Sequence, residues 1–130
     1  MIDFENPIFR EFYSSVSELC PDGGVTGVYT PRPTRFPNVV FREMDNYTVR
    51  KFRNSSMEEQ IARITYVMDV TAQSKAEARK VFKAGDDKLI AMNFTRLGSP
   101  FTDDSNNPRI FRIIGRYEAD IDPNGMIYRS

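Results

Sequence analysis

The sequence predicts an α+β domain with a mainly antiparallel sheet of about four to five strands and two helices packed on one face. Apolar residues recur at three-to-four spacing near residues 7–19 and again near 74–92, and the segments around them alternate apolar and polar residues. The first pattern is typical of amphipathic helices and the second of strands with one buried face. Their order along the chain, helix, strands, helix, strands, indicates the α+β class.

The length of 130 residues fits one domain, spanning 1–130. The chain is 40% hydrophobic and 28% charged, close to an ordinary soluble protein. It has no long apolar run, so we expect no membrane-spanning helix. The opening "MIDFENPIFREF" has acidic residues where a signal peptide would need basic ones, which predicts synthesis in the cytoplasm.

The first helix is expected at about 7–19, with Asn6 as its cap and Pro7 at its first position. "PDGG" at 21–24 ends it. Its apolar face is predicted to comprise Ile8, Phe9, Phe12, Tyr13, Val16, Leu19 and Cys20.

A short edge strand at 25–29 and an exposed segment at about 30–37 are expected next. The prolines of "TPRPTRFP" exclude a central strand there. A strand at about 38–45 follows, with Val39, Phe41 and Glu43 on one side. Glu43 is expected to titrate normally.

The stretch "NYTVRKFRNSSMEEQ" then separates two strands and offers little to a core. We expect an exposed loop at about 46–59, which is long for a hairpin connection and therefore typical of a functional or disordered segment.

The clearest strand pattern is "QIARITYVMDVTA", in which one face should be buried. A second helix begins at Ser74, whose capping box is completed by Glu77. Gly85 in its apolar stripe predicts a bend or a close neighbour. We interpret Asp86 and Asp87 as a solvated helix face rather than a metal or acid/base site.

The last third reads as strands at 93–99 and 109–121, separated by a polar turn region at 99–108. "DPNG" at 122–125 is a strong turn signal, and "MIYRS" should form a short strand or arm. The acidic start of 103–106 lacks the glycine and glutamate of a calcium loop, so calcium is disfavoured.

The residue inventory argues against an enzyme. The chain has no histidine, so no Ser–His or Cys–His pair can form, and its one cysteine, Cys20, is interpreted as a packing thiol. "PDGGVTG" lacks the lysine of a phosphate-binding loop. We therefore predict no catalytic residues, no metal and no cofactor; a small enzyme or nucleotide-binding domain is the alternative from another class.

The net charge is zero but unevenly spread. Residues 1–30 carry one cation and five anions, whereas residues 31–56 carry six cations and two anions. Complementary fields of this kind orient partners, so contact between copies of the chain is one interpretation. A balanced, solvated surface is the other.

Three stretches carry a family resemblance: "FPNVVFREMDN", "SSMEEQIARITYVMDVTAQSKAEARK" and "RIFRIIGRYEADIDPNGMIYR". They resemble the tail-terminator (tail-completion) proteins of tailed bacteriophages, often called minor capsid proteins. The similarity runs from about Phe36 to Arg129, and the ending is its most specific part.

The resemblance implies a structural virion protein at the head-tail junction, assembled in the bacterial cytoplasm. Such subunits form a ring, usually of six copies, that caps the tail tube and ends its polymerisation. The partners would be other copies, the major tail (tube) protein and a head-completion protein, with DNA passing through the lumen without specific binding. A head-completion or adaptor protein is the alternative.

Within that role, the loop at 46–59 and the proline-rich segment are the predicted contacts with a neighbouring subunit or the tail tube. The residues expected to make these contacts are Arg50, Lys51, Phe52, Arg53, Arg32 and Arg35.

Overall fold

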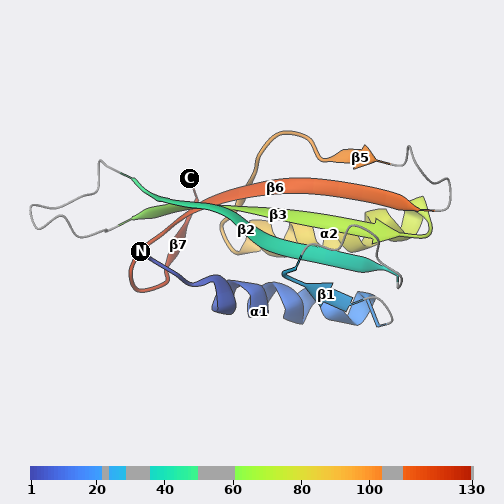
Figure 1. Ribbon diagram of the computed structural model, residues 1–130, viewed down its shortest axis with the longest axis horizontal. Helices are drawn as coiled ribbons and strands as arrows, with labels where there is room; N and C mark the ends of the chain where they lie inside the picture. The colour runs from blue at the N-terminus through green and yellow to red at the C-terminus, as the bar shows by residue number, and fades with distance from the viewer. Residues whose placement is uncertain (22–23, 29–35, 50–60, 104–109, 130) are drawn as a thin grey trace, which may run out of the picture.

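The computed structural model describes residues 1–21, 24–28, 36–49, 61–103 and 110–129 (Figure 1). Its helical elements are α1 (Glu5–Val16), the 3₁₀ turn η1 (Ser17–Leu19) and α2 (Lys75–Ala91). Its strands are β1 (Gly24–Thr26), β2 (Asn38–Thr48), β3 (Ala62–Ala72), β4 (Thr95–Arg96), β5 (Phe101–Asp103), β6 (Phe111–Ile121) and β7 (Ile127–Tyr128).

The strands form one sheet built around three long, antiparallel members, in the order β2, β3, β6. The outer edge of β6 is shared by β4, β5 and β7, which pair with successive parts of it. On the far side β1 pairs with β2 in parallel. Both helices lie on the same side of the sheet in Figure 1.

The α+β class, the mainly antiparallel sheet and the two helices on one face are therefore confirmed, with one correction to the number of strands. The described part of the chain has seven strands rather than four to five, because short pieces share the edge of β6. Among the described strands, β1 and β2 form the one parallel pair, and the other pairs are antiparallel.

The β2–β3 hairpin is longer than the alternation of its residues predicts. β2 continues to Thr48, and Val49 N–H donates to the Ile61 carbonyl at 3.0 Å, so residues 46–48 are strand and not loop. The alternation is interrupted by a bulge between Glu43 and Asp45. A bulge shifts the inward positions by one residue, which conceals the second half of the strand from pattern reading.

An aromatic stack joins the helices to the sheet. Phe12 of α1 stacks on Phe41 of β2 at 4.1 Å between ring centroids, and Phe41 stacks on Tyr66 of β3 at 4.7 Å. Phe94 meets Tyr66 edge-on at 5.7 Å. These rings are fully buried, so the predicted inward positions of α1, β2 and β3 meet in one core.

Helix α1 differs from the prediction at its start and on its face. It begins at Glu5, so Asn6 lies inside the first turn and does not cap; Asp3 Oδ1 instead accepts from Glu5 N–H at 3.2 Å. Tyr13 is 46% exposed rather than buried. The predicted Cys20 packing position is confirmed, and burial raises the pKa of its thiol to about 11.

Helix α2 follows the prediction closely. Ser74 Oγ accepts from Glu77 N–H at 3.1 Å, which is the expected cap. Gly85 allows a close approach rather than a bend: a Cβ there would lie 3.1 Å from Phe12 Cε2 and closer still to the Met68 sulfur. Gly115 in β6 serves the same purpose, because a Cβ there would lie 2.8 Å from Phe82 Cζ.

In the last third, the strand expected at 93–99 shrinks to β4, and β5 forms inside the expected turn region. Asn93 at φ 71° and Gly98 at φ 69° take the left-handed conformation and interrupt regular pairing there. The turn at 122–125 and the strand β7 after it are confirmed: Gly125 N–H donates to the Asp122 carbonyl at 3.0 Å.

Candidate functional site

The six residues predicted to make contacts lie outside the residues that the structure describes. Arg50, Lys51, Phe52 and Arg53 belong to the connection from β2 to β3, and Arg32 and Arg35 precede β2. The structure does describe the base from which the first group departs, and two charged surfaces near it.

The base of the hairpin is held by a row of side chains across three strands. Tyr47, Arg63 and Asp120 are cross-strand neighbours on β2, β3 and β6. Arg63 Nε donates to Asp120 Oδ1 at 2.8 Å, and Tyr47 also bonds Arg63 and supports its charge. The chain therefore enters and leaves the 50–60 segment from fixed positions.

The first charged surface is the face of the sheet turned away from the helices, which we name the arginine face. This face contains a hollow of about 340 Å³, and the residues that line it come from β2, β3 and β6. They are Val40, Arg42, Met44, Val67, Asp69, Arg112, Ile114 and Arg116.

This face corrects the prediction that β3 has only one buried side. Val67 is 8% exposed although it points away from the helices. Its cross-strand neighbours are Arg42 and Arg116, whose long aliphatic stems can cover it. Asp69 is 7% exposed and is bound by Arg112 through two bonds, of 2.9 Å and 2.6 Å. One carboxylate thus faces three guanidinium groups, so the surface is basic.

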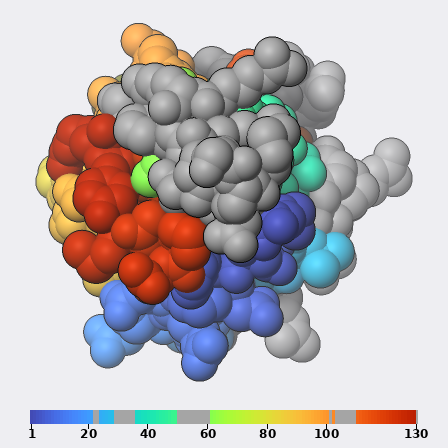
Figure 2. Space-filling model, turned by 90° about the vertical axis from the view of Figure 1, so that its left-hand side faces the viewer, coloured from blue at the N-terminus to red at the C-terminus, as the bar shows by residue number. Residues whose placement is uncertain are grey.

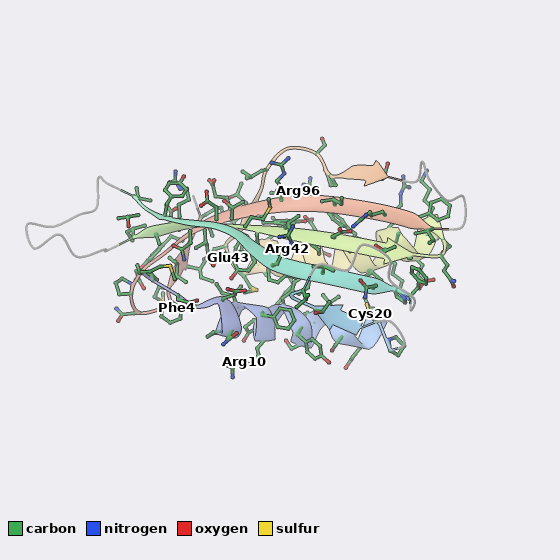
Figure 3. All side chains as sticks on the ribbon, in the orientation of Figure 1. Phe4, Arg10, Cys20, Arg42, Glu43 and Arg96 are labelled. Atoms are coloured by element: carbon green, nitrogen blue, oxygen red, sulfur yellow. The ribbon has the colours of Figure 1, made fainter. Side chains whose placement is uncertain are left out.

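The second surface gathers carboxylates at the other side of β2, and we name it the acidic end. It comprises Asp3, Glu5 and Glu43, and the charge of Asp45, which lies beyond the bulge opposite Thr65, also acts on Glu43. Arg42 and Glu43 are consecutive on β2 and so leave opposite faces of the sheet (Figure 3). Asn46 fastens the N-terminal segment here, because its Nδ2 donates to the Ile2 carbonyl at 2.8 Å. Figure 2 looks at this end of the molecule, where the dark blue N-terminal residues lie close to the red C-terminal ones.

Glu43 does not titrate normally, contrary to the expectation from the sequence. Burial, followed by the negative charges of Glu5 and Asp3, raises the pKa of its carboxyl to about 7, and the Asn46 amide opposes the rise. The side chain occupies an inward position opposite Tyr66 on the helix side of the sheet. Near neutral pH it therefore exchanges a proton.

Two buried polar atoms lie next to this carboxylate. The Tyr66 hydroxyl and Asn46 Oδ1 have no hydrogen-bond partner among the described residues, and Tyr66 is 0% exposed. Burial, followed by the charges of Glu43, Glu5 and Asp3, raises the pKa of the Tyr66 hydroxyl well above its usual value. Two buried oxygen atoms without a hydrogen-bond partner, the Tyr66 hydroxyl and Asn46 Oδ1, therefore lie beside the acidic end.

The acidic character of the first 30 residues is only partly available to a partner. Glu11 is paired with Lys88 of α2 at 3.0 Å, so it is used inside the molecule. Arg10 points away from the sheet (Figure 3). The described part of the segment 31–56 is likewise divided, because Arg42 joins the arginine face whereas Glu43 joins the acidic end.

Asp86 and Asp87 do not form one solvated face. Asp87 is exposed and pairs with Lys83 at 2.8 Å, as a solvated residue would. Asp86 is mostly buried: it accepts from the Tyr117 hydroxyl at 2.7 Å and pairs with Arg96 at 3.1 Å. It ties α2 to β4 and β6, which is a structural role.

Two further findings concern metal binding and membrane crossing in the described ranges. No group of three or more Asp, Glu or Cys side chains there is placed to hold a metal ion. No helix there is long and apolar enough to cross a membrane.

Sequence reasoning did not identify the acidic end or the arginine face as sites. The available signal was Glu43 itself, a carboxylate on the same strand face as Val39 and Phe41. A charge in an apolar series indicates either a partner or a shifted pKa. Its neighbours Asp3 and Glu5 lie about 40 residues away in sequence, and only the fold brings them together.

A scan against protein-family models finds no match to this chain, and a search of the curated proteins finds none either. Functional inference therefore depends on the two charged surfaces, the hairpin and the sequence resemblance.

Proposed function

We propose that this chain is a structural subunit that caps a phage tail tube as a ring, ends tube polymerisation and forms the interface for head attachment. The observation that carries the proposal is the separation of charge: the arginine face and the acidic end lie on opposite sides of the same strand, β2. A ring made by head-to-tail contacts needs two different, complementary patches on each subunit. The resemblance in sequence supplies the identity of the assembly.

The β2–β3 hairpin supports the same proposal. The hairpin strands β2 and β3 pair along their length, and β3 also pairs with β6, where Arg63 bonds Asp120. These contacts fix the points at which the chain leaves and re-enters the sheet. Three cations and Phe52 stand between these points in the sequence. An anchored segment with an apolar residue among cations suits docking on a neighbour, with Phe52 as the buried anchor and the cations as polar contacts.

The decisive experiment shortens the hairpin without disturbing the sheet. Replacing residues 50–60 by Asn-Gly joins Val49 to Ile61, which are already paired, through a two-residue turn. The purified variant should keep its circular dichroism spectrum and unfold cooperatively. Mixed with tubes of the major tail protein, the wild-type chain should bind one tube end and stop growth in electron micrographs, and the variant should not.

A matched control neutralises cations on another surface, with Lys75→Ser and Lys80→Ser on the exposed part of α2. This control should cap tubes normally. Tubes that the shortened variant caps as well as wild type would refute the role of the hairpin. If the wild-type protein does not bind tubes but binds head connectors, the chain belongs to the head-completion class instead.

A further inference from the structure

Several carboxylates of the described chain are matched with a cation, whereas the acidic end brings together carboxylates that are not. The matched carboxylates are in the pairs Glu11–Lys88, Asp69–Arg112, Asp86–Arg96, Asp87–Lys83 and Asp120–Arg63, whereas Glu18, Glu77 and Asp122 have no such ion pair among the described residues. Asp3, Glu5 and Glu43 have no ion-pair partner among the described residues, and, after burial, the charges of Glu5 and Asp3 raise the cost of ionising Glu43. The cluster therefore has an excess of negative charge that a cation would relieve.

The buried atoms beneath the cluster indicate the same kind of partner. Buried polar groups in folded proteins are almost always hydrogen-bonded, so the Tyr66 hydroxyl and Asn46 Oδ1 need an explanation. Asn46 Oδ1 and the ionised carboxylates can only accept hydrogen bonds, and the phenol oxygen can accept one. What is missing is a group with several donors and a positive charge. A guanidinium has five such donors and an ammonium has three.

We propose that the acidic end, formed by Asp3, Glu5 and Glu43, binds the cationic segment Arg50–Arg53 of a second copy of this chain. This segment holds three cations in four residues, the densest positive stretch of the sequence, and the whole chain is neutral. The cationic segment and the acidic end carry opposite charges and belong to the same polypeptide, as a head-to-tail contact requires. The inference rests on the proposed ring and names the surface that receives the hairpin.

The test uses a fluorescent peptide spanning 46–60 and the full-length chain, with binding followed by anisotropy at low salt. Wild type should bind. Glu43→Gln and the double variant Asp3→Asn/Glu5→Gln should each weaken binding about tenfold, which corresponds to about 1.4 kcal/mol. The control Glu18→Gln changes an exposed carboxylate outside the cluster and should have no effect. A peptide with Ser at 50, 51 and 53 should not bind.

A zero-length carbodiimide reaction locates the contact. It joins a carboxylate to an amine, so Lys51 of the peptide should be found by mass spectrometry on Glu43, Asp3 or Glu5. The hairpin-shortened variant should bind the peptide as wild type does. If only the shortened variant binds, the chain's own segment occupies the site and a second copy does not.

Absence of binding by both proteins, or binding that the acidic-end variants leave unchanged, would overturn the inference. Neither reaction contains tail tubes. Failure of the peptide to bind would therefore leave tube capping to be judged on its own experiment, and failure of capping would leave the peptide result standing.

Discussion

At the scale of single residues, environment changes the chemistry of groups that the sequence presents as ordinary. Glu43 and Asp86 are both carboxylates in regular elements, yet one lacks a cation and the other has Arg96 and the Tyr117 hydroxyl. The first has a pKa raised to about 7. The difference comes from which side chains the fold places around each carboxylate.

Glu43 should make stability depend on pH. Its pKa is about 7 when folded and 4.5 ordinarily, so between these values the folded state holds a proton that the unfolded state has released. Stability must therefore fall as pH rises from about 4.5 to 7. Asp3, Glu5 and Asp45 reinforce the rise in pKa, Asn46 opposes it, and Tyr66 faces the same group.

Glu43→Gln mimics the protonated form, so its melting temperature should exceed that of wild type at pH 8 and match it near pH 4.5. The expected gain at pH 8 is on the order of 1 kcal/mol, because partial exposure screens the site. Thermal unfolding across this range checks it. An equal difference between the two proteins at every pH would contradict the role of the proton.

The Tyr117–Asp86 bond should stabilise the protein more than the similar Tyr128–Asp122 bond. Tyr117 is 0% exposed and its bond is 2.7 Å, whereas Tyr128 is 46% exposed with a bond of 3.0 Å. Tyr117→Phe should cost about 1–2 kcal/mol of unfolding free energy, and Tyr128→Phe less than about 0.5 kcal/mol. Urea unfolding compares them directly, and equal costs would argue against the burial argument.

At the scale of elements, the fold depends on how closely α2 approaches the sheet. Gly85 on α2 faces Met68 and Phe12, and Gly115 on β6 faces Phe82. These two positions without a side chain let the helix settle onto β3 and β6, which places Asp86 within reach of Tyr117.

Gly85→Ala tests how closely α2 lies against the sheet, because alanine improves helix propensity but crowds the packing. Alanine gains about 1 kcal/mol of helix propensity. The added methyl must displace the Met68 sulfur and Phe12, and overpacking costs about 1–3 kcal/mol, so net destabilisation of up to about 2 kcal/mol is expected. Gly27→Ala is the control, since a Cβ there would lie 3.5 Å from its nearest neighbour. A more stable Gly85→Ala variant would show that the contact can relax.

The hairpin shows how far element prediction from sequence reaches. The alternation in 62–72 predicted β3 and its inward residues, and the Ser74 cap predicted the start of α2, because both signals are local. The end of β2 and the start of α1 were predicted less well. A bulge changes the period within β2. The Asn6-Pro7 pair is a strong start signal, yet α1 begins at Glu5, whose N–H donates to Asp3 Oδ1.

At the scale of the whole molecule, zero net charge conceals two charged surfaces of opposite sign. Such surfaces favour association between copies when their contacts are ionic. The ring proposal therefore predicts association that weakens with salt.

Sedimentation of the wild-type chain should show larger species at low ionic strength than at about 0.5 M salt, where exposed charges more than a few ångströms apart are screened. Arg50→Ser/Lys51→Ser/Arg53→Ser should remove most of this dependence, and Lys75→Ser/Lys80→Ser should not. Association that persists unchanged in high salt would point to an apolar interface instead.

The sequence by itself determined the α+β class, the three long strands, the two helices and most of their residues that face the core. These follow from periodicity and capping, which act over a few residues. Only the tertiary structure decided that β1 runs parallel to β2, that Asp86 is bonded rather than solvated, and that Asp3 and Glu5 join Glu43 over the Tyr66 hydroxyl. The physical reason is that pKa values, ion pairs and charged surfaces depend on distances between residues far apart in the chain, and a one-dimensional pattern does not contain those distances.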